Sequence, residues 1–195
     1  VMDMYAENDS ILWIATAWGL NKYNIKQNQV YPYLETDYDT TPDSVDMTRF
    51  HDIYDDENGL LLLGSDGGVR FFDKVAGKFV APYAEFADFF HNLEKTQVNE
   101  VEGIGKKDIW VGTDNGFYHL ERETGNISHY VNQPDTWNTL SNNNILSMMK
   151  DNAGNLWIGT NWGLNRFDYE NEQFSQFYHI KGNQYSLSSN SVSTM

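Results

Sequence analysis

Three tryptophans in predicted turns and loops are the residues of this sequence best suited to hold a ligand. Trp18 and Trp162 each precede a glycine in a tight turn, and Trp137 lies in a longer loop. An indole ring presents a large apolar face that stacks on a sugar or on another ring, and it is costly to expose without a partner. We therefore predict a ligand-binding role for Trp18, Trp137 and Trp162. The alternative is that these rings pack under a neighbouring loop.

Patterns that would indicate catalysis or metal binding are weak. The five histidines do not occur at the i, i+4 spacing of metal ligands on a helix. Phosphate-binding, dinucleotide-binding and nucleophile-elbow motifs are missing from the sequence. The acidic stretch with Asp37, Asp39, Asp43 and Asp46 lacks the glycine and the terminal glutamate of a calcium loop, so we interpret it as a solvated linker. We predict no catalytic residue, no bound metal and no cofactor.

The composition argues against several classes of partner. The 195 residues include 28 acidic and 13 basic side chains, which gives a net charge of −15. A field of this sign repels phosphate backbones and anionic lipids, so we expect no nucleic acid to bind. No apolar stretch approaches the roughly 20 residues of a membrane helix, so we expect no membrane insertion. The chain has no cysteine, which excludes disulfides and thiolate chemistry.

Trp18 and Trp162 belong to a repeat of thirteen residues that occurs four times without a gap. Its copies are residues 12–24, 61–73, 109–121 and 156–168. The glycine that follows the tight turn recurs at steps of 49, 48 and 47 residues, at Gly19, Gly68, Gly116 and Gly163. Self-similarity at this period is typical of propellers and of repeat arrays.

Each repeat contains the signals of four strands. In the clearest copy, Leu156 to Thr160 and Leu164 to Asp168 are predicted strands around a tight turn. Ile145 to Lys150 is predicted as the strand before them, and Phe174 to Tyr178 as an outer strand after them. Four antiparallel strands in each repeat predict an all-β fold, a β-propeller. The predicted blades are residues 1–49, 50–97, 98–144 and 145–191, with residues 192–195 as the first strand of a fifth blade. We expect the chain to be a fragment of a larger propeller; the alternative is a closed four-bladed ring with a dangling or swapped end.

Other recurring residues are interpreted as scaffold. A bulky residue at one strand position is predicted to pack between blades, at Trp13, Trp110 and Trp157. Small residues two positions later predict close packing near a narrow channel, at Ala15, Gly64, Gly112 and Gly159. Phenylalanines at helical spacing predict a short helix within residues 85–95.

The stretch from Asp151 to Asp168 resembles the two-component regulator propeller repeat. Its lead-in, from Asn138 to Ile145, is similar to that of the same family and is echoed by residues 185–192. The resemblance covers essentially the whole chain. It is looser in the second repeat, where Leu62 replaces the tryptophan, and in the third, where Tyr118 and His119 replace asparagine and arginine.

This resemblance implies the extracytoplasmic sensor part of a hybrid two-component regulator. Members of the family typically have two seven-bladed propellers, a membrane helix, a histidine kinase, a receiver and a DNA-binding domain. They detect breakdown products of polysaccharides and switch on glycan-utilisation genes through a phosphorelay. The resemblance therefore implies a non-enzymatic periplasmic segment that binds an oligosaccharide. It also implies further blades and a second propeller in the same polypeptide, and a homodimer of the full-length protein.

Two other classes of function remain open. A propeller enzyme that acts on glycans, or one similar to the streptogramin lyases, needs a histidine and carboxylates gathered at one site. His51, His91 and His119 are the histidines on which we expect this hypothesis to depend. A protein-interaction scaffold is the third hypothesis, because propellers are common docking platforms.

Overall fold

The computed structural model describes residues 1–34, 49–104, 107–168 and 171–195. Within these residues, the strands form four antiparallel sheets of four strands each, and neighbouring strands of a sheet are consecutive in the sequence. The predicted all-β class and the four four-stranded antiparallel sheets are confirmed. The acidic stretch from Asp37 to Asp46 lies outside the described residues.

The chain divides into two compact units, Val1–Lys106 and Lys107–Met195. The first sheet is β1 Asp3–Asn8, β2 Ile11–Thr16, β3 Gly19–Asn24 and β4 Gln29–Tyr33. The second sheet is β5 Phe50–Asp55, β6 Leu60–Ser65, β7 Gly68–Asp73 and β8 Lys78–Val80. The first unit also contains the 3-10 helix η1 Ala84–Phe86, the helix α1 Ala87–Asn92 and the strand β9 Val98–Ile104.

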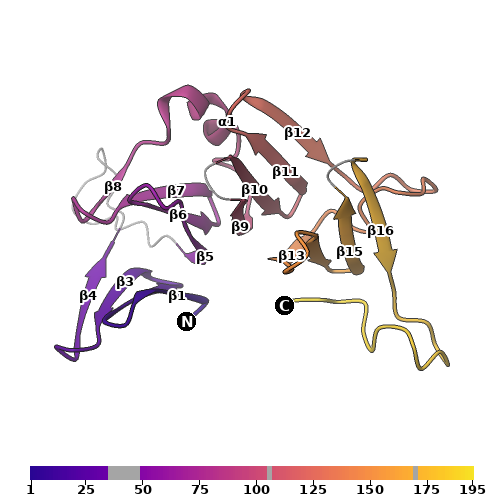
Figure 1. Ribbon diagram of the computed structural model, residues 1–195, viewed down its shortest axis with the longest axis horizontal. Coiled ribbons are helices and arrows are strands. Elements are labelled where there is room, and N and C mark those ends of the chain that lie inside the picture. The colour runs from indigo at the N-terminus through magenta and orange to yellow at the C-terminus, as the bar shows by residue number, and fades with distance from the viewer. Residues whose placement is uncertain (35–48, 105–106, 169–170) are drawn as a thin grey trace. The chain divides into compact units, whose positions relative to one another are not determined.

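The second unit contains the remaining strands. Those of the third sheet are β10 Asp108–Thr113, β11 Gly116–Glu121 and β12 Asn126–Tyr130. Those of the fourth sheet are β13 Ile145–Lys150, β14 Leu156–Thr160, β15 Gly163–Asp168 and β16 Gln173–Phe177. The strands of a sheet follow one another as hairpins (Figure 1). The points at which one predicted blade passes to the next stay predictions.

A hydroxyl closes the tight turn between the second and third strands of each sheet. In the fourth sheet, Thr160 Oγ1 donates to Gly163 O at 2.8 Å and accepts from Trp162 N at 3.1 Å. Gly163 has a φ of +120°, which favours glycine. The same two hydrogen bonds recur at Thr16, Ser65 and Thr113. These bonds explain why the repeat requires a hydroxyl residue and, three residues later, a glycine.

Glycines on the second strands let a neighbouring segment approach closely. A Cβ atom on Gly64 would lie 2.9 Å from the Val98 carbonyl oxygen, and one on Gly159 would lie 2.4 Å from the Val192 carbonyl oxygen. The predicted close packing is confirmed at these two glycines. Residues 192–195 form no strand in the structure. Val192 N nevertheless donates to Thr160 O at 3.1 Å, and the fifth-blade strand stays a prediction.

Two of the three recurring tryptophans are buried between sheets, as predicted. Trp13 is fully buried on β2, and its ring centroid lies 5.4 Å from that of Phe72 on β7. Trp110 is fully buried on β10, 5.6 Å from Phe167 on β15. Trp157 is half-buried and contacts a ring of its own sheet. The predicted packing between blades is therefore seen at Trp13 and Trp110.

Carboxylates connect the first strands of the first unit. Asp3 on β1 accepts a hydrogen bond from Ile53 N on β5 at 3.1 Å through Oδ2. Asp52 occupies the corresponding position on β5 and accepts one from Val101 N on β9 at 2.7 Å. Burial raises the pKa of Asp52 to about 8, and the negative charge of Asp3 raises it further against the opposing effect of the Val101 N–H. One side chain per strand thus ties three first strands together.

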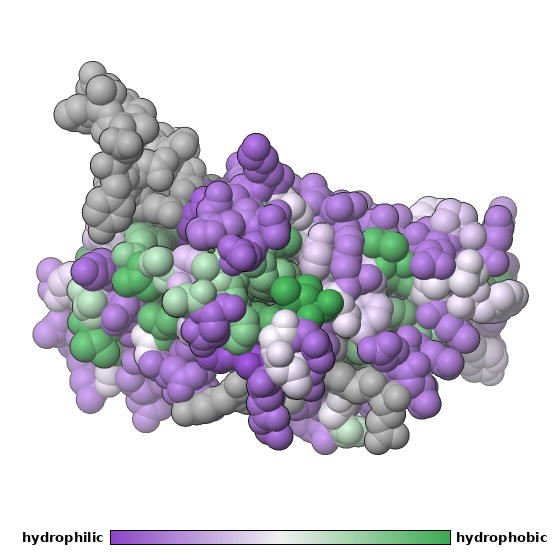
Figure 2. Space-filling view, turned by 90° about the horizontal axis from the view of Figure 1, so that it is seen from above, coloured by the Kyte–Doolittle hydropathy of each residue, from purple (hydrophilic) through white to green (hydrophobic). Residues whose placement is uncertain are grey.

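The predicted helix within residues 85–95 is confirmed by η1 and α1. Phe89 and Phe90 of α1 and the adjoining Leu93 are buried. The ring centroid of Phe90 lies 4.8 Å from that of Phe71 on β7. Much of the face in Figure 2 is hydrophilic. The sequence has a net charge of −15.

Candidate functional site

All three predicted ligand-binding tryptophans are largely exposed. The exposed fraction is 87% for Trp137, 62% for Trp18 and 59% for Trp162. Trp18 lies in the first unit, in the turn between β2 and β3, whereas Trp137 and Trp162 lie in the second unit. These large exposed fractions disfavour the alternative that the rings pack under a neighbouring loop. Of the three, Trp137 combines the greatest exposure with an adjacent pocket.

Hydrogen bonds at its base hold the loop that carries Trp137. Asn143 Oδ1 accepts from Asn132 N at 2.6 Å, and Asn132 Nδ2 donates to Leu140 O at 2.7 Å. Asn143 O accepts from Gly116 N, at the start of β11, at 2.8 Å. These bonds close residues 132–143 into a compact loop and attach it to the third sheet.

A second set of hydrogen bonds shapes the middle of the loop. Thr139 Oγ1 accepts from Gln133 N at 3.3 Å and donates to Thr136 O at 3.2 Å. Gln176 on β16 donates through Nε2 to Thr139 O at 2.7 Å. The loop is therefore fixed to the outer strand of the fourth sheet as well as to the third sheet.

A buried asparagine completes the attachment. Asn165 on β15 is fully buried, accepts from Ser141 N at 2.9 Å and donates through Nδ2 to Ser141 Oγ at 2.8 Å. Ser141 Oγ also lies 3.1 Å from Thr160 Oγ1, the hydroxyl that closes the β14–β15 turn. The asparagine of the repeat motif thus serves to hold the loop in place.

The following loop, residues 179–190, repeats this scaffold with another residue at its tip. Asn190 Oδ1 accepts from His179 N at 2.6 Å, and Asn190 O accepts from Gly163 N at 2.7 Å, as Asn143 does one repeat earlier. In the same way, Ser186 Oγ accepts from Ile180 N and donates to Asn183 O, as the Thr139 hydroxyl does with Gln133 and Thr136. The position of Trp137 is occupied by Gln184, 47 residues later. The scaffold therefore forms without a tryptophan at this position.

A pocket of about 420 Å³ lies between the Trp137 loop and β16. Its described lining includes amide, hydroxyl and aromatic side chains and one carboxylate, and it contains no Lys, Arg or His. The lining residues are Asn132, Gln133, Pro134, Asp135, Thr136, Trp137, Gln176 and Tyr178. Pockets of this size with an aromatic wall and a few polar groups are typical of small-molecule sites.

The sequence identified one wall of this pocket and missed the other. Trp137 lines it, but Trp18 and Trp162 do not. Gln176 and Tyr178 line it from β16 and from just beyond that strand, and sequence reasoning treated this region as an outer strand alone. A comparison of residues 133–143 with residues 180–190 indicates this site from the sequence. The two loops share the residues that form the loop scaffold and differ at the tip, where Trp137 lies.

The histidines that the enzyme hypothesis depends on are engaged in separate contacts. His51 Nε2 lies 2.6 Å from Asp66 Oδ1 in the first unit, where His91 lies 3.8 Å from Glu94 on the helix segment. His119 Nε2 lies 2.7 Å from Asp108 Oδ1 in the second unit. His119 also stacks on Trp110, with 3.7 Å between ring centroids. Each of these three histidines thus has its own carboxylate partner among the described residues.

Two further pockets lie beside these histidines. One of about 410 Å³ is lined by Arg70, Phe90, His91 and Glu94 in the first unit. The other, of about 330 Å³, is lined by His119, Glu121 and Glu172 among others in the second unit. Across the described parts of the chain, no three His, Asp or Glu side chains are grouped to hold a metal ion. Nor is any helix in those parts long and apolar enough to cross a bilayer.

Comparison with known proteins agrees with the fold. Residues 139–162 match the model of the two-component regulator propeller. These residues form the second half of the Trp137 loop, the hairpin of β13 and β14 and the turn with Trp162. A search among curated proteins by sequence finds no significant match.

Solved structures with a similar fold are much longer than this chain. The extracellular domain of the hybrid two-component system BT4673 from B. thetaiotaomicron superimposes with a TM-score of 0.72 at 20% identity over 95% of this chain and 22% of that one. For the extracellular domain of BT3049, a hybrid two-component system of the same organism, the TM-score is 0.70 at 21% identity over 97% and 30% of the two chains. PorZ, a surface component of the type-IX secretion system of Porphyromonas gingivalis, gives 0.55 at 12% identity over 92% and 21%.

These similarities establish the architecture. The four sheets have the fold of propeller blades, and the chain spans less than a third of each solved chain. The small part of each solved chain that this chain covers agrees with the prediction that it is a fragment of a larger propeller. The chain has the fold of extracellular domains of Bacteroides hybrid two-component systems, and it carries a two-component regulator propeller repeat at residues 139–162.

Proposed function

We propose that this chain is a non-catalytic, ligand-binding propeller segment in the periplasmic sensor part of a hybrid two-component protein. Its ligand is an oligosaccharide released from a polysaccharide. The full-length protein passes the signal through a histidine kinase and a phosphorelay to the transcription of glycan-utilisation genes. Further blades, a second propeller and a second copy of the polypeptide are the partners that this function requires.

One observation carries the proposal. The residues matched by the regulator-propeller model, 139–162, include the hydrogen-bonded base of the loop that presents Trp137. That loop borders a pocket of about 420 Å³. The repeat that links the chain to a family of regulators thus also anchors the loop that lines this pocket.

Signalling needs a ligand that distinguishes two states of the protein. A sugar in a loop pocket shifts the equilibrium only by the difference between its affinities for the two states. Neighbouring segments pack closely against the glycine backbone at Gly64 and Gly159, so a shift between them would have to break these contacts. We therefore place the two-state element at contacts between propellers or between protomers, which a ligand-bearing loop can bias.

A thermal-shift screen of the chain against neutral and acidic oligosaccharides tests this function, with each mixture then checked by mass spectrometry. A rise in the unfolding midpoint with intact sugar is the expected result. New product masses would show an enzyme and overturn the non-catalytic part of the proposal. Deletion of this segment from the full-length protein is expected to abolish the response to the sugar, and an unchanged response would contradict a sensing role.

A further inference from the structure

We infer that the pocket between the Trp137 loop and β16 is a subsite for an uncharged sugar unit, with the Trp137 indole as its stacking platform. The inference rests on the proposed function and adds to it the position of the contact and the charge of the ligand. It is carried by four features: the exposure of Trp137, the fixed loop, the polar lining and the distribution of charge.

The exposure of Trp137 has no explanation in the packing of the loop. The loop of residues 179–190 keeps the corresponding hydrogen bonds with Gln184 at the same position, so the scaffold does not need an aromatic ring there. A ring that is 87% exposed contributes little to the core and presents its apolar face to solvent. The C–H face of a pyranose ring is a suitable partner for such a surface.

The loop holds its ring in place before any ligand arrives. Its two ends are joined through Asn132 and Asn143, its middle is fixed to β16 through Gln176, and buried Asn165 holds Ser141. A segment fixed at three places loses little conformational entropy when a ligand binds. The pocket is therefore preorganised for a weakly interacting ligand such as a sugar.

The polar groups of the pocket suit hydroxyl groups. Asn132, Gln133, Thr136, Gln176 and Tyr178 line it with amides and hydroxyls, and side chains of these types both donate and accept hydrogen bonds. Sugar hydroxyls also do both. The volume of about 420 Å³ accommodates a sugar unit and lies within the usual range of roughly 300–1,000 Å³ for ligand pockets.

Charge selects the class of sugar. Asp135 carries the one formal charge among the described lining residues, and it is negative. The chain as a whole has a net charge of −15. A uronate or a sulfated sugar would bring a second negative charge into this field without a cation in the lining to compensate for it. A carboxylate accepts hydrogen bonds from neutral sugar hydroxyls readily.

Isothermal titration calorimetry of the 195-residue chain tests the inference. The probes are cellotetraose, xylotetraose and mannotetraose, together with tetragalacturonic acid and its fully methyl-esterified form. We expect at least one neutral tetrasaccharide to bind, and the ester to bind more tightly than the acid. Trp137→Ala is expected to raise the Kd of the neutral ligand about tenfold, the effect of losing one aromatic stacking partner. Tyr185→Ala, which removes an exposed ring of the next loop that lies outside the pocket, is the control and is expected to change the Kd less than about twofold.

A further variant tests the role of charge. Asp135→Asn removes the carboxylate and suits the backbone there, since asparagine tolerates the φ of +63°. It is expected to reduce the preference for the methyl ester over the acid. An unfolding midpoint equal to that of the parent chain verifies that each variant is folded.

The possible failures are distinguishable. Binding that Trp137→Ala leaves unchanged, or that Tyr185→Ala abolishes instead, overturns the subsite and leaves the sensor function standing. Tighter binding of tetragalacturonic acid than of its ester overturns the selection for uncharged sugars. If none of the five probes binds, the proposed function as an oligosaccharide sensor segment fails, and the subsite fails with it.

Discussion

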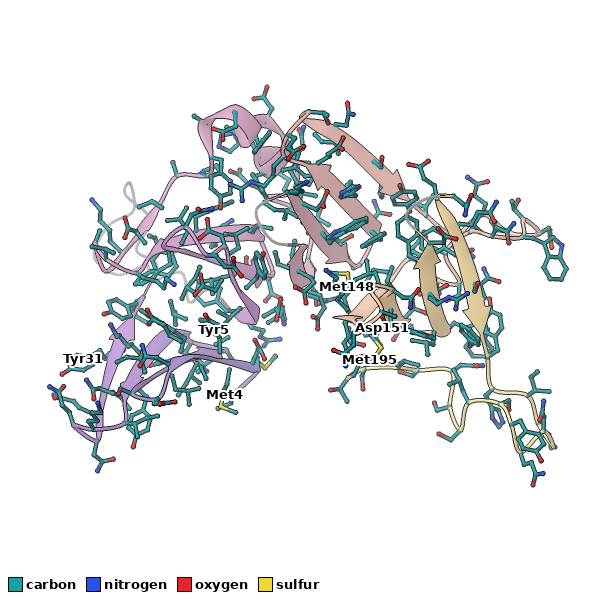
Figure 3. All side chains as sticks on the ribbon, viewed as in Figure 1. Met4, Tyr5, Tyr31, Met148, Asp151 and Met195 are labelled. Carbon is teal, nitrogen blue, oxygen red and sulfur yellow. The ribbon has the colours of Figure 1, made fainter. Side chains whose placement is uncertain are left out.

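Trp157 donates its indole N–H to Asp151 across the turn between β13 and β14, with 2.9 Å between Nε1 and Oδ2. Asp151, which is labelled in Figure 3, also accepts from Asn155 N at 2.8 Å, so one carboxylate fixes both the turn and the first residues of the next strand. In the first sheet, Glu7 accepts from Trp13 Nε1 at the same distance of 2.9 Å. The acidic residue and the tryptophan of the repeat are therefore hydrogen-bonding partners, six residues apart.

Substitution Trp157→Phe tests this pairing. Phenylalanine retains an aromatic ring against Phe177 but removes the donor, so we expect the unfolding midpoint of the chain to fall by about 2–4 °C. Differential scanning calorimetry measures it. Trp18→Phe, at a ring that is 62% exposed, is the matched control and should leave the midpoint unchanged. Equal midpoints for Trp157→Phe and the parent chain would show that the hydrogen bond is dispensable.

Acid should weaken the same turn. The N–H groups of Trp157 and Asn155 lower the pKa of Asp151 to about 2, because they stabilise its charged form. The stability that this provides is present above the ordinary pKa and is lost as the pH falls toward 2. We expect Asp151→Asn to be less stable than the parent chain at pH 7, and the difference in midpoint to shrink as the pH is lowered to about 2.

Calorimetry of both proteins between pH 7 and pH 2 makes this measurement, with Asp9→Asn in the corresponding turn of the first sheet as the control. A difference between Asp151→Asn and the parent chain that stays constant over this range would contradict the proposed role of charge.

The pair of Asp3 and Asp52 predicts the opposite pH dependence. Burial raises the pKa of Asp52 to about 8, so the folded chain retains a proton that the unfolded chain loses at a lower pH. This contribution is fully present below about pH 4 and is lost as the pH rises toward 8, by at most about 1.4 kcal/mol for each pH unit. Asp52→Asn keeps an acceptor for Val101 N without a titrating group.

Urea denaturation of the parent chain and of Asp52→Asn at several values between pH 5 and pH 8 tests this prediction. We expect the free energy of unfolding of the parent chain to decrease relative to that of the variant as the pH rises. Two parallel curves would mean that Asp52 titrates alike in the folded and unfolded chains.

Overpacking of the second strands gives the fourth prediction. In Gly159→Ala, the new methyl group would lie 2.4 Å from the Val192 carbonyl oxygen, so the backbone must move. We expect a cost of about 1–3 kcal/mol, the usual range for overpacking. Chemical denaturation measures it. The segment around Val192 is expected to lose amide protection in hydrogen exchange.

Gly154→Ala serves as the control for the loss of a glycine. A Cβ atom there meets nothing within 4 Å, and only the φ of +88° opposes the substitution. It should lower stability without changing the protection of Val192. If both variants expose Val192 equally, the close approach at Gly159 is not what holds that segment.

The strands were predictable because the repeat encodes them locally. The hydroxyl and the glycine that close the turn, at Thr160 and Gly163, are three residues apart, and so their type and spacing alone indicate the hairpin. The burial of Trp13 and Trp110 followed from their recurrence. Residues 192–195 form no strand within this chain, where one backbone hydrogen bond joins Val192 to Thr160, and the fifth-blade strand stays a prediction.

The site was harder to predict because it depends on contacts between distant residues. Trp137 was identified from its residue type, but its exposure depends on a loop that is held by Gln176 from another strand, through a hydrogen bond to Thr139. Trp18 and Trp162 have the same residue type and lie outside the pocket. A residue type indicates what a side chain is able to bind, whereas the enclosure around it depends on which segments fold against each other.

The glycines at positions 64 and 159 also bear on how such a protein diversifies. At these points, the missing Cβ atom of the glycine sets the spacing between neighbouring segments, because the carbonyl oxygen and a Cγ1 atom of Val98 or Val192 lie close to where that atom would stand. Mutations that reshape the loops, including replacement of the residue at the tip, leave that spacing intact. A lineage can therefore acquire new ligand preferences by exchanging loop residues while the dimensions of its framework are inherited unchanged.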